Sequence, residues 1–348
     1  MIAPCRVHRA MRLPLALVAW CALSACALPL APDKDGPDAL TGGTEKEFAV
    51  PGFEKRGFIV HLPPGYDGTP IPLVLALHGG GGSSESARKV TCNEGKDCLT
   101  DVADRENFAV VFPDGHPGDF FEDLRTWNAG GGADGFQCVS GQACLNNIDD
   151  MAFFDALHDE LLRAVHVDED RVYATGLSNG GAMAHRLACE RSTRFAAIAP
   201  VGAGNQVSTV QGCTIARAVP VLMIHGTDDP CWSFEQSAAA CAQEDDQTKI
   251  GVAETLAGWT ERNGCVGDVV TEALPDATDD GMTTSRESHG GCVDGGDVVL
   301  LTVQGGGHTW PSGDQYLGKD RVGLVTTDFD ADDEIWTFFQ AHPRVIAE

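Results

Sequence analysis

Basic residues are scarce in this chain of 348 residues, where 24 Lys and Arg stand against 51 Asp and Glu and the net charge is −27. Residues 1–25 contain three arginines and no acid, so their removal would make the chain more acidic still. A surface with this excess of negative charge repels nucleic acids and anionic polymers. We therefore expect no nucleic-acid partner, although the same charge would also keep an exported protein dispersed in water.

The amino-terminal apolar run is too short to span a membrane. Leu13–Leu23 follows three arginines and falls well short of the about 20 residues that cross a bilayer, a pattern typical of a secretory signal peptide. Its end, Leu23–Cys26, resembles the bacterial lipobox, which predicts cleavage after residue 25 and lipidation of Cys26; simple secretion is the alternative. The protein would then be extracellular or anchored by lipid at the bacterial cell envelope, with residues 26–44 as a flexible tether and 45–348 as one domain.

Metal-site spacings are absent as well. The chain has no Cys-x-x-Cys pair and no His-x-x-x-His pair, so we expect no zinc. The acidic run Asp328–Glu334 lacks the glycine of a calcium loop and is typical of a helix amino terminus. Of thirteen cysteines, cleavage would remove Cys5 and Cys21 and commit Cys26 to lipid, which leaves ten, an even number that predicts disulfides in an exported chain. Nearness in the chain favours the pairs Cys92–Cys98, Cys138–Cys144, Cys189–Cys213, Cys231–Cys241 and Cys265–Cys292.

A glycine-rich run around Ser178 is the most informative motif. A predicted strand at residues 171–175 leads into Gly176–Gly181, and a predicted helix follows. A serine on such a strand-to-helix turn is exposed as a nucleophile in α/β-hydrolases, and the flanking glycines make room for the crowded backbone. An ordinary glycine-rich turn is the alternative. The context favours Ser178 as a nucleophile.

An acid and a histidine follow the serine in the chain order that this fold requires. The apolar run 219–225 predicts a buried strand that leads to Asp228 and Asp229, and we prefer Asp229 because of its turn position before proline. The last predicted strand, 297–303, leads through three glycines to His308. These positions predict a triad of Ser178, Asp229 and His308. Activity should then fall as His308 becomes protonated, at about pH 6–7 for an unperturbed imidazole.

A second glycine run predicts the oxyanion hole. The apolar run 71–77 precedes His78 and four glycines, which resemble the HGGG-type loop of lipases and esterases. The hole would combine the amide of Gly80, or alternatively Gly79, with the amide of Asn179. A phosphate-binding loop would need the Lys-Ser/Thr pair that this run lacks, so we expect no nucleotide and no cofactor.

Apolar runs and helical patterns alternate along the whole domain. Strands are expected at 58–62, 71–77, 108–112, 171–175, 195–200, 219–225 and 297–303. Helices are expected near 148–165, 180–190, 250–263 and 331–341. This alternation predicts an α/β fold in one domain, with a mostly parallel, doubly wound sheet of the α/β-hydrolase type.

Four segments carry a family resemblance over nearly all of residues 47–342: Arg125–Gly130, Ile148–Phe153, Arg171–Glu190 and His308–Pro311. They resemble the secreted feruloyl esterase and polyhydroxybutyrate depolymerase group of α/β-hydrolases. The resemblance implies serine carboxylester hydrolysis by the same triad, with the acid four residues after the histidine that ends its strand. It leaves open hydroxycinnamoyl esters of plant polysaccharides, acetylated xylan and polyesters as substrates.

Among these substrates we expect a feruloyl ester. A neutral xylan ester or polyester would not be repelled by the acidic surface, and no polyester-docking module follows the last helix. Trp310 and Trp232 are candidates to stack on a feruloyl ring; packing within their own loops is the alternative. Cys231–Phe234 departs from the short aliphatic run that often follows the acid in this group. An inactive surface-binding lipoprotein is the alternative of another class, and prolyl-peptidase relatives usually have tyrosine where this chain has Asn179.

Overall fold

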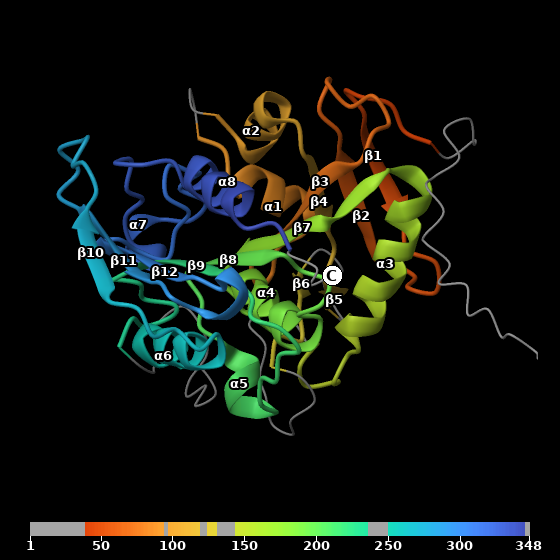
Figure 1. Cartoon of the computed structure of the whole chain (residues 1–348). Coiled ribbons are helices and arrows are strands. Elements are labelled where there is room, and N and C mark those ends of the chain that lie inside the picture. The colour runs from red at the N-terminus through yellow and green to blue at the C-terminus, as the bar shows by residue number, and fades with distance from the viewer. Residues whose placement is uncertain (1–38, 94–96, 119–123, 131–142, 236–249, 345–348) are drawn as a thin grey trace, which may run out of the picture. The chain divides into compact units, whose positions relative to one another are not determined.

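A computed structural model describes residues 39–93, 97–118, 124–130, 143–235 and 250–344 (Figure 1). All of them belong to one compact unit, Pro32–Glu348. The predicted signal peptide and Cys26 lie outside the described residues, as does most of the predicted tether. Within the described ranges, no helix combines the length and apolar character that a bilayer crossing requires.

A ten-stranded sheet forms the centre of this unit, in the order β1-β2-β4-β3-β7-β8-β9-β12-β11-β10 (Figure 1). Its strands are β1 (Glu45–Ala49), β2 (Gly57–His61), β3 (Ile71–Leu77), β4 (Ala109–Pro113), β7 (Val167–Leu177), β8 (Ala197–Val201), β9 (Val221–Gly226), β10 (Val269–Ala273), β11 (Thr283–His289) and β12 (Val298–Gln304). A small separate ribbon pairs β5 (His116–Pro117) with β6 (Arg125–Thr126).

The middle of the sheet is parallel from β4 to β12, whereas β2 and β11 pair antiparallel with their neighbours on both sides. Every residue of β3, β4, β8 and β9 is buried, as expected for parallel strands covered on both faces. Parallel strands end at one edge of a sheet, so the segments that follow β3, β7, β9 and β12 meet there. These segments contain all the predicted site residues of the oxyanion loop and the triad.

Helices cover both faces of the sheet. They are α1 (Ser84–Val90), α2 (Leu99–Glu106), α3 (Asp150–Ala164), α4 (Asn179–Glu190), α5 (Gln206–Val210), α6 (Val252–Arg262), α7 (Lys319–Val322) and α8 (Ala331–Ala341), with a 3-10 turn at Val293–Gly295. Two core clusters follow from this layering. Alternate residues of β3 divide between them: Leu73 and Leu75 belong to the cluster that includes α3, α4 and α6, whereas Val74 and Ala76 belong to the cluster that includes α1, α2 and α8.

Each predicted strand and helix is present in the structure, with ends displaced by a few residues. The predicted doubly wound, mostly parallel sheet of a single α/β domain is confirmed. The acidic run begins α8 as expected, because the Asp330 side chain caps it by accepting a hydrogen bond from the amide of Asp332. The edge strands β1 and β10 and the strand β11 beside β10 were not predicted, since their residues are mostly polar or exposed.

Candidate active site

Ser178 occupies a strained backbone position between β7 and α4. Its φ of 59° and ψ of −123° lie in a region that L-residues rarely adopt, at a cost of about 1–3 kcal/mol. The surrounding structure holds this conformation: the Ser178 amide donates to the carbonyl of Val201 at 2.9 Å, and its carbonyl accepts from Ala182 at 2.9 Å. The strand-to-helix turn predicted from the glycine run is therefore present.

Gly176 and Gly180 are required by the crowding at this turn. A Cβ atom at Gly176 would lie 2.7 Å from the carbonyl oxygen of Leu77, and one at Gly180 would lie 2.3 Å from the same oxygen. Both distances are far below van der Waals contact, so neither position tolerates a side chain without moving the backbone of β3 or of the turn. The prediction that these glycines relieve backbone crowding is confirmed.

Asp229 and His308 form a buried hydrogen-bonded pair. Nδ1 of His308 donates to Oδ2 of Asp229 at 2.7 Å, and the other carboxylate oxygen accepts from the amides of Cys231 and Trp232, each at 2.7 Å. Burial acts to raise the pKa of Asp229, but the interactions with His308 and His225 outweigh it and hold this pKa well below its usual range. Asp229 is therefore an ionised hydrogen-bond acceptor for the imidazole.

Two backbone contacts fix the loop that carries His308. Its amide donates to the carbonyl of Val322 at 2.6 Å, and its carbonyl accepts from the hydroxyl of Tyr316 at 3.0 Å. The imidazole lies against Gly202, directly after β8, where an added Cβ would be 3.1 Å from Nδ1. Because the preceding residue, Val201, binds the amide of Ser178, the histidine and the strained serine belong to the same corner of the sheet edge.

A second histidine, His225, also contacts Asp229. Its Nε2 atom lies 3.3 Å from Oδ2 of Asp229 and 2.7 Å from the carbonyl oxygen of Trp232. The sequence placed His225 at the end of β9 as a marker for the position of the acid. It did not predict that the imidazole would touch the carboxylate, although the spacing of four residues was the available signal.

The glycine loop after β3 lies beside Ser178. A Cβ at Gly79 would be 3.6 Å from the Cβ of Ser178. The loop is held by hydrogen bonds from Gly82 to the carbonyl of Gly79 at 3.0 Å and from Gly81 to the carbonyl of Arg125 at 2.8 Å. Within the described parts of the chain, the amides of Gly79, Gly80 and Asn179 make no hydrogen bond. These amides can therefore donate to a ligand.

Trp127 joins the two predicted halves of the oxyanion hole. Its amide donates to Oδ1 of Asn179 at 2.7 Å, and its carbonyl accepts from Nδ2 of the same side chain at 3.0 Å. Its indole N–H donates to the carbonyl of His78 at 3.1 Å, where the glycine loop begins. Sequence reasoning noted Trp127 only as part of a family-like segment and missed this structural role.

A buried ion pair contacts the backbone next to Trp127. Arg56 and Asp150 lie 2.7 Å apart, and the second oxygen of Asp150 accepts from the amide of Asn128 at 2.6 Å. The Arg56 guanidinium also covers the ring of Phe153 at 3.6 Å. Removing one partner of such a pair leaves an uncompensated buried charge and is strongly destabilising, so the fold of this segment depends on both residues.

His78 holds the glycine loop through its side chain. Nδ1 donates to the carbonyl of Gly79 at 2.8 Å, and Nε2 accepts from the amide of Gly115 at 2.9 Å. Burial lowers the pKa of His78 to about 4, so the ring is neutral near pH 7 and able to accept. His78 is accordingly a structural residue of the loop.

Trp310 and Trp232 pack in the core, the alternative that the sequence left open for both. Trp310 is 1% exposed, and its indole donates to the buried carboxyl group of Asp332 at 3.1 Å. Trp232 is 3% exposed and donates to the carbonyl of Ile250 at 3.0 Å. Buried indoles need such partners. Neither ring is presented to solvent in this arrangement, so it does not support the predicted stacking on a substrate.

Three predicted disulfides are present: Cys92–Cys98, Cys189–Cys213 and Cys265–Cys292. Cys144 and Cys231 are also disulfide-bonded, and their predicted partners, Cys138 and Cys241, lie outside the described residues. Cys231 has its sulfur close to ligand atoms of Asp229 and His308, a grouping that suggests a metal site. A disulfide sulfur is not a thiolate, and His308 already binds Asp229, so this grouping is better explained by the acid–histidine pair.

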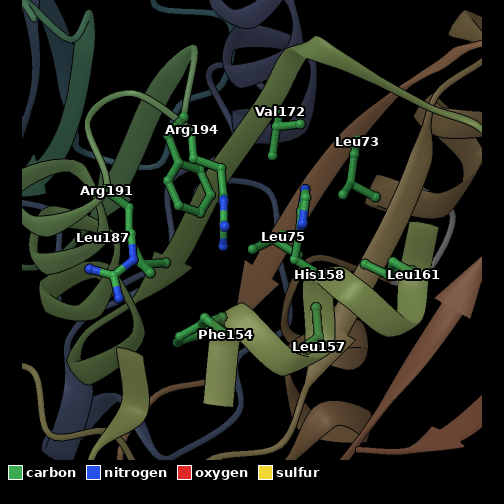
Figure 2. A pocket seen from close by; sticks show the side chains of 11 residues that line it. Leu73, Leu75, Phe154, Leu157, His158, Leu161, Val172, Leu187, Arg191 and Arg194 are labelled. Atoms are coloured by element: carbon green, nitrogen blue, oxygen red, sulfur yellow. The ribbon is translucent and has the colours of Figure 1, made fainter. Parts of the chain in front are cut away.

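A separate apolar pocket lies between α3 and the sheet (Figure 2). His158 projects from α3 among apolar side chains, and its Nε2 atom is buried without a hydrogen bond among the described residues. Burial is the main cause that lowers the pKa of His158 to about 4. No predicted site residue lines this pocket.

The sheet order, the strained serine and the buried acid–histidine pair define an α/β-hydrolase. A solved acetyl xylan esterase from Aspergillus awamori has the same fold, with a TM-score of 0.50 and 16% identity over 85% of this chain and 99% of that chain.

The sequence profile described as "Esterase PHB depolymerase" matches residues 56–237. "Putative esterase NocK" of Nocardia uniformis subsp. tsuyamanensis is 35% identical over 79% of this chain and 76% of that protein. "Feruloyl esterase B" of Piromyces equi is 29% identical over 77% of this chain and 45% of that protein, so the chain spans less than half of its length. The chain belongs to the esterase PHB depolymerase family and is a carboxylic ester hydrolase.

Proposed function

We propose that this protein is an exported feruloyl esterase that cleaves hydroxycinnamoyl esters of plant cell-wall polysaccharides through Ser178, His308 and Asp229. The observation that supports the proposed triad is the ionised Asp229, which is bound to Nδ1 of His308 at the same corner of the sheet edge as the strained Ser178. An imidazole held in this way keeps its Nε2 lone pair for proton transfer.

Catalysis begins when Nε2 of His308 takes the proton of the Ser178 hydroxyl as its oxygen attacks the ester carbonyl. The carbonyl oxygen becomes an oxyanion and accepts hydrogen bonds from the amide of Asn179 and from Gly80, with Gly79 as the alternative donor. The imidazolium then gives its proton to the departing alcohol as the ester bond breaks. Asp229 stabilises the charged ring throughout and stays ionised.

Water completes the reaction by the same route. His308 removes a proton from a water molecule, which attacks the acyl carbon of the acyl-Ser178 ester. The second tetrahedral intermediate uses the same two amides and collapses to the free acid. The proton on His308 returns to the Ser178 oxygen. No cofactor or metal takes part in this sequence of steps.

The feruloyl preference rests on similarity and on charge. Feruloyl esterase B of Piromyces equi is among the relatives that align over about three quarters of this chain. The net charge of −27 disfavours anionic polymers and leaves a neutral polysaccharide ester accessible. Export and lipidation at Cys26 rest on the apolar run and the lipobox-like sequence before this residue.

Acetylated xylan is the second candidate substrate. A bifunctional acetylxylan esterase/xylanase of Neocallimastix patriciarum aligns over 74% of this chain at 26% identity, although the alignment covers only 31% of that protein. The family description leaves a polyester as a further possibility. All three substrates are esters that the same residues would cleave.

The test is the release of ferulate from methyl ferulate and feruloylated arabinoxylan by residues 45–348, compared with acetylxylan and short polyhydroxybutyrate. We expect preferential ferulate release that is lost in Ser178→Ala. Cleavage of another ester with ferulate untouched would overturn the substrate assignment and leave the triad in place. A fluorophosphonate probe that fails to label Ser178 in the wild type would favour the inactive surface-binding protein.

A further inference from the structure

The carboxylate of Asp229 lies between two imidazoles. Its Oδ2 atom is 2.7 Å from Nδ1 of His308 and 3.3 Å from Nε2 of His225, and all three side chains are almost completely buried. His308 is accounted for by the proposed mechanism. His225 is a second buried histidine beside Asp229, and the proposed mechanism assigns no step to it.

The proton of His225 can be placed by its neighbours. Nε2 lies 2.7 Å from the carbonyl oxygen of Trp232, which can only accept, so Nε2 must carry a proton. The same nitrogen lies 3.3 Å from Oδ2 of Asp229, so its N–H, which is directed mainly at the Trp232 carbonyl, also interacts with this carboxylate. Nδ1 of His225 is buried and has no hydrogen bond among the described residues. A buried nitrogen without a hydrogen bond costs free energy, and an apolar residue at this position would avoid that cost. The benefit of a histidine here therefore comes mainly from its Nε2–H donor.

Asp229 is thereby surrounded by four N–H groups. The amides of Cys231 and Trp232 bind one carboxylate oxygen, and the two imidazoles face the other. Among the described residues, the titratable groups near this carboxylate are His225, His308 and Tyr316, whose hydroxyl donates to the carbonyl of His308. Of these groups, His225 contacts the oxygen that His308 binds and has no step of its own in the proposed mechanism.

We propose that His225 is a positioning residue whose fixed Nε2–H holds Oδ2 of Asp229 in place and limits how strongly this carboxylate attracts the proton of His308. The proposal rests on the triad proposed above. The imidazole is suited to this task because its ring is held edge-on against Phe234, with 5.9 Å between ring centres and an interplanar angle of 78°. A rigid donor restricts the carboxylate, whereas a flexible one would follow it.

Loss of the donor should raise the pH at which His308 is protonated. With His225 replaced by leucine, the negative charge on Oδ2 has one fewer N–H partner and stabilises the His308 imidazolium more strongly. The proton affinity of His308 should increase on the order of three- to tenfold. In His225→Gln the side-chain amide can still donate, so the proton affinity should return toward that of the wild type.

The experiment is a pH titration of histidine ring nitrogens by NMR in protein labelled with ¹⁵N-histidine, with His308→Gln used to assign the signal. We expect the His308 midpoint to move to higher pH in H225L and to return in H225Q. The acid limb of the pH profile of kcat/KM should move in the same direction. An unchanged midpoint in a folded H225L would overturn the proposal, even if kcat falls, because that result indicates a packing role alone.

The wild-type spectrum provides a second test that does not depend on whether H225L folds. His225 should carry a proton on Nε2 throughout the range in which the enzyme is folded, and a ring protonated only on Nδ1 would overturn the proposal. Both NMR measurements use no ester. A wild type that hydrolyses no ester would refute the proposed function while the titration still decides the role of His225.

Discussion

His308 is almost completely buried and His158 is partly buried, and the two side chains lie in different chemical environments. His308 follows β12 at the carboxyl edge of the sheet and binds the carboxylate of Asp229, which also accepts hydrogen bonds from two backbone amides. His158 projects from α3 into a pocket lined mainly by leucines and phenylalanines (Figure 2), and its pKa falls to about 4. Burial, together with the nearby charge of Arg194, therefore keeps the His158 imidazole neutral, whereas an ionised partner such as Asp229 stabilises the imidazolium of a general base.

The same contrast applies to the backbone of the two regions. The carboxyl edge holds a strained serine and glycines whose replacement would bring a Cβ within 3 Å of other backbone atoms. The layer between α3 and the sheet is regular helix on regular strand, with apolar contacts and no positive φ among its lining residues. Of these two regions, the carboxyl edge contains the buried polar groups and the strained serine, and the apolar layer stabilises the sheet that holds them.

Removal of the nucleophile should have the largest effect on activity. Ser178→Ala should lower kcat for any ester on the order of 10⁶-fold, because attack by the serine oxygen is lost. Hydrolysis of methyl ferulate measures the effect. Ser208→Ala is the matched control, since among the described residues the hydroxyl of Ser208 in α5 hydrogen-bonds to the carbonyl of Asn205, which precedes this helix. Activity within tenfold of the wild type in Ser178→Ala would show that the carboxyl edge of β7 is not the reacting region.

A milder change tests the link between Trp127 and the oxyanion hole. Asn179→Ala removes both hydrogen bonds to the Trp127 backbone and keeps the Asn179 amide in the chain. We expect kcat to fall about 10- to 100-fold with little change in KM, because the amide is less precisely placed.

Thr175→Val is the control for this change. It removes a buried hydrogen bond from Thr175 in β7 to the carbonyl of Ala199 in β8, and within the described parts of the chain neither residue is hydrogen-bonded to Trp127. If both variants lose equal stability and only Asn179→Ala loses activity, the link positions the amide. Equal activity losses would refute that interpretation.

Trp310 tests whether a buried ring near His308 belongs to the reacting region or to the core. Trp310→Phe removes the indole donor to Asp332 and should lower the free energy of unfolding by about 1–2 kcal/mol. The ratio of activity on feruloyl and acetyl esters should not change. Urea denaturation measures the change in stability, and hydrolysis of a feruloyl ester and of an acetyl ester measures the activity ratio.

Trp336→Phe is the matched control in α8, because its indole nitrogen is buried without a hydrogen bond among the described residues. It should cost less stability than Trp310→Phe. A shift in ester preference caused by Trp310→Phe would instead restore the substrate-stacking role expected from the sequence.

The smallest expected effect concerns His158. Its pKa in the folded protein is below that of an unfolded histidine, so the unfolded state binds more protons between about pH 4 and pH 6.5. His158 therefore destabilises the fold progressively as the pH falls through this range. His158→Leu should make the loss of stability between pH 7 and pH 5 smaller by on the order of 1 kcal/mol.

Urea denaturation at the two pH values measures this difference, with His289→Gln as the control outside the pocket. An identical pH dependence in wild type and His158→Leu would show that the pocket does not disfavour the charged ring. Esterase activity at pH 7 should be unaffected, which separates this layer of the molecule from the carboxyl edge.

Much of the fold could be predicted because the buried parallel strands are continuous apolar runs. The run at Ile71–Leu77 and the run that ends at His225 needed no partner to be recognised. The strand β10 could not be recognised in this way. All five of its residues, Val269–Ala273, are exposed, and it exists because β11 offers an unpaired edge.

Order along the chain determined which residues of the site were foreseeable. Ser178, Asp229 and His308 each come after a recognisable strand, and parallel strands bring their succeeding loops to one edge of the sheet. The roles of Trp127 and His225 were decided only by the tertiary structure. Trp127 meets Asn179 across 52 residues of sequence, and the contact of His225 with Asp229 depends on how the turn after β9 folds back.

The sequence by itself determined the α/β architecture and the three residues of the proposed triad, because local apolar patterns and chain order carry that information. Only the tertiary structure decided that Trp310 and Trp232 pack in the core, since a tryptophan in a loop has no local signal for the direction of its ring. Hydrogen-bond partners of buried groups come from distant segments, and packing selects them.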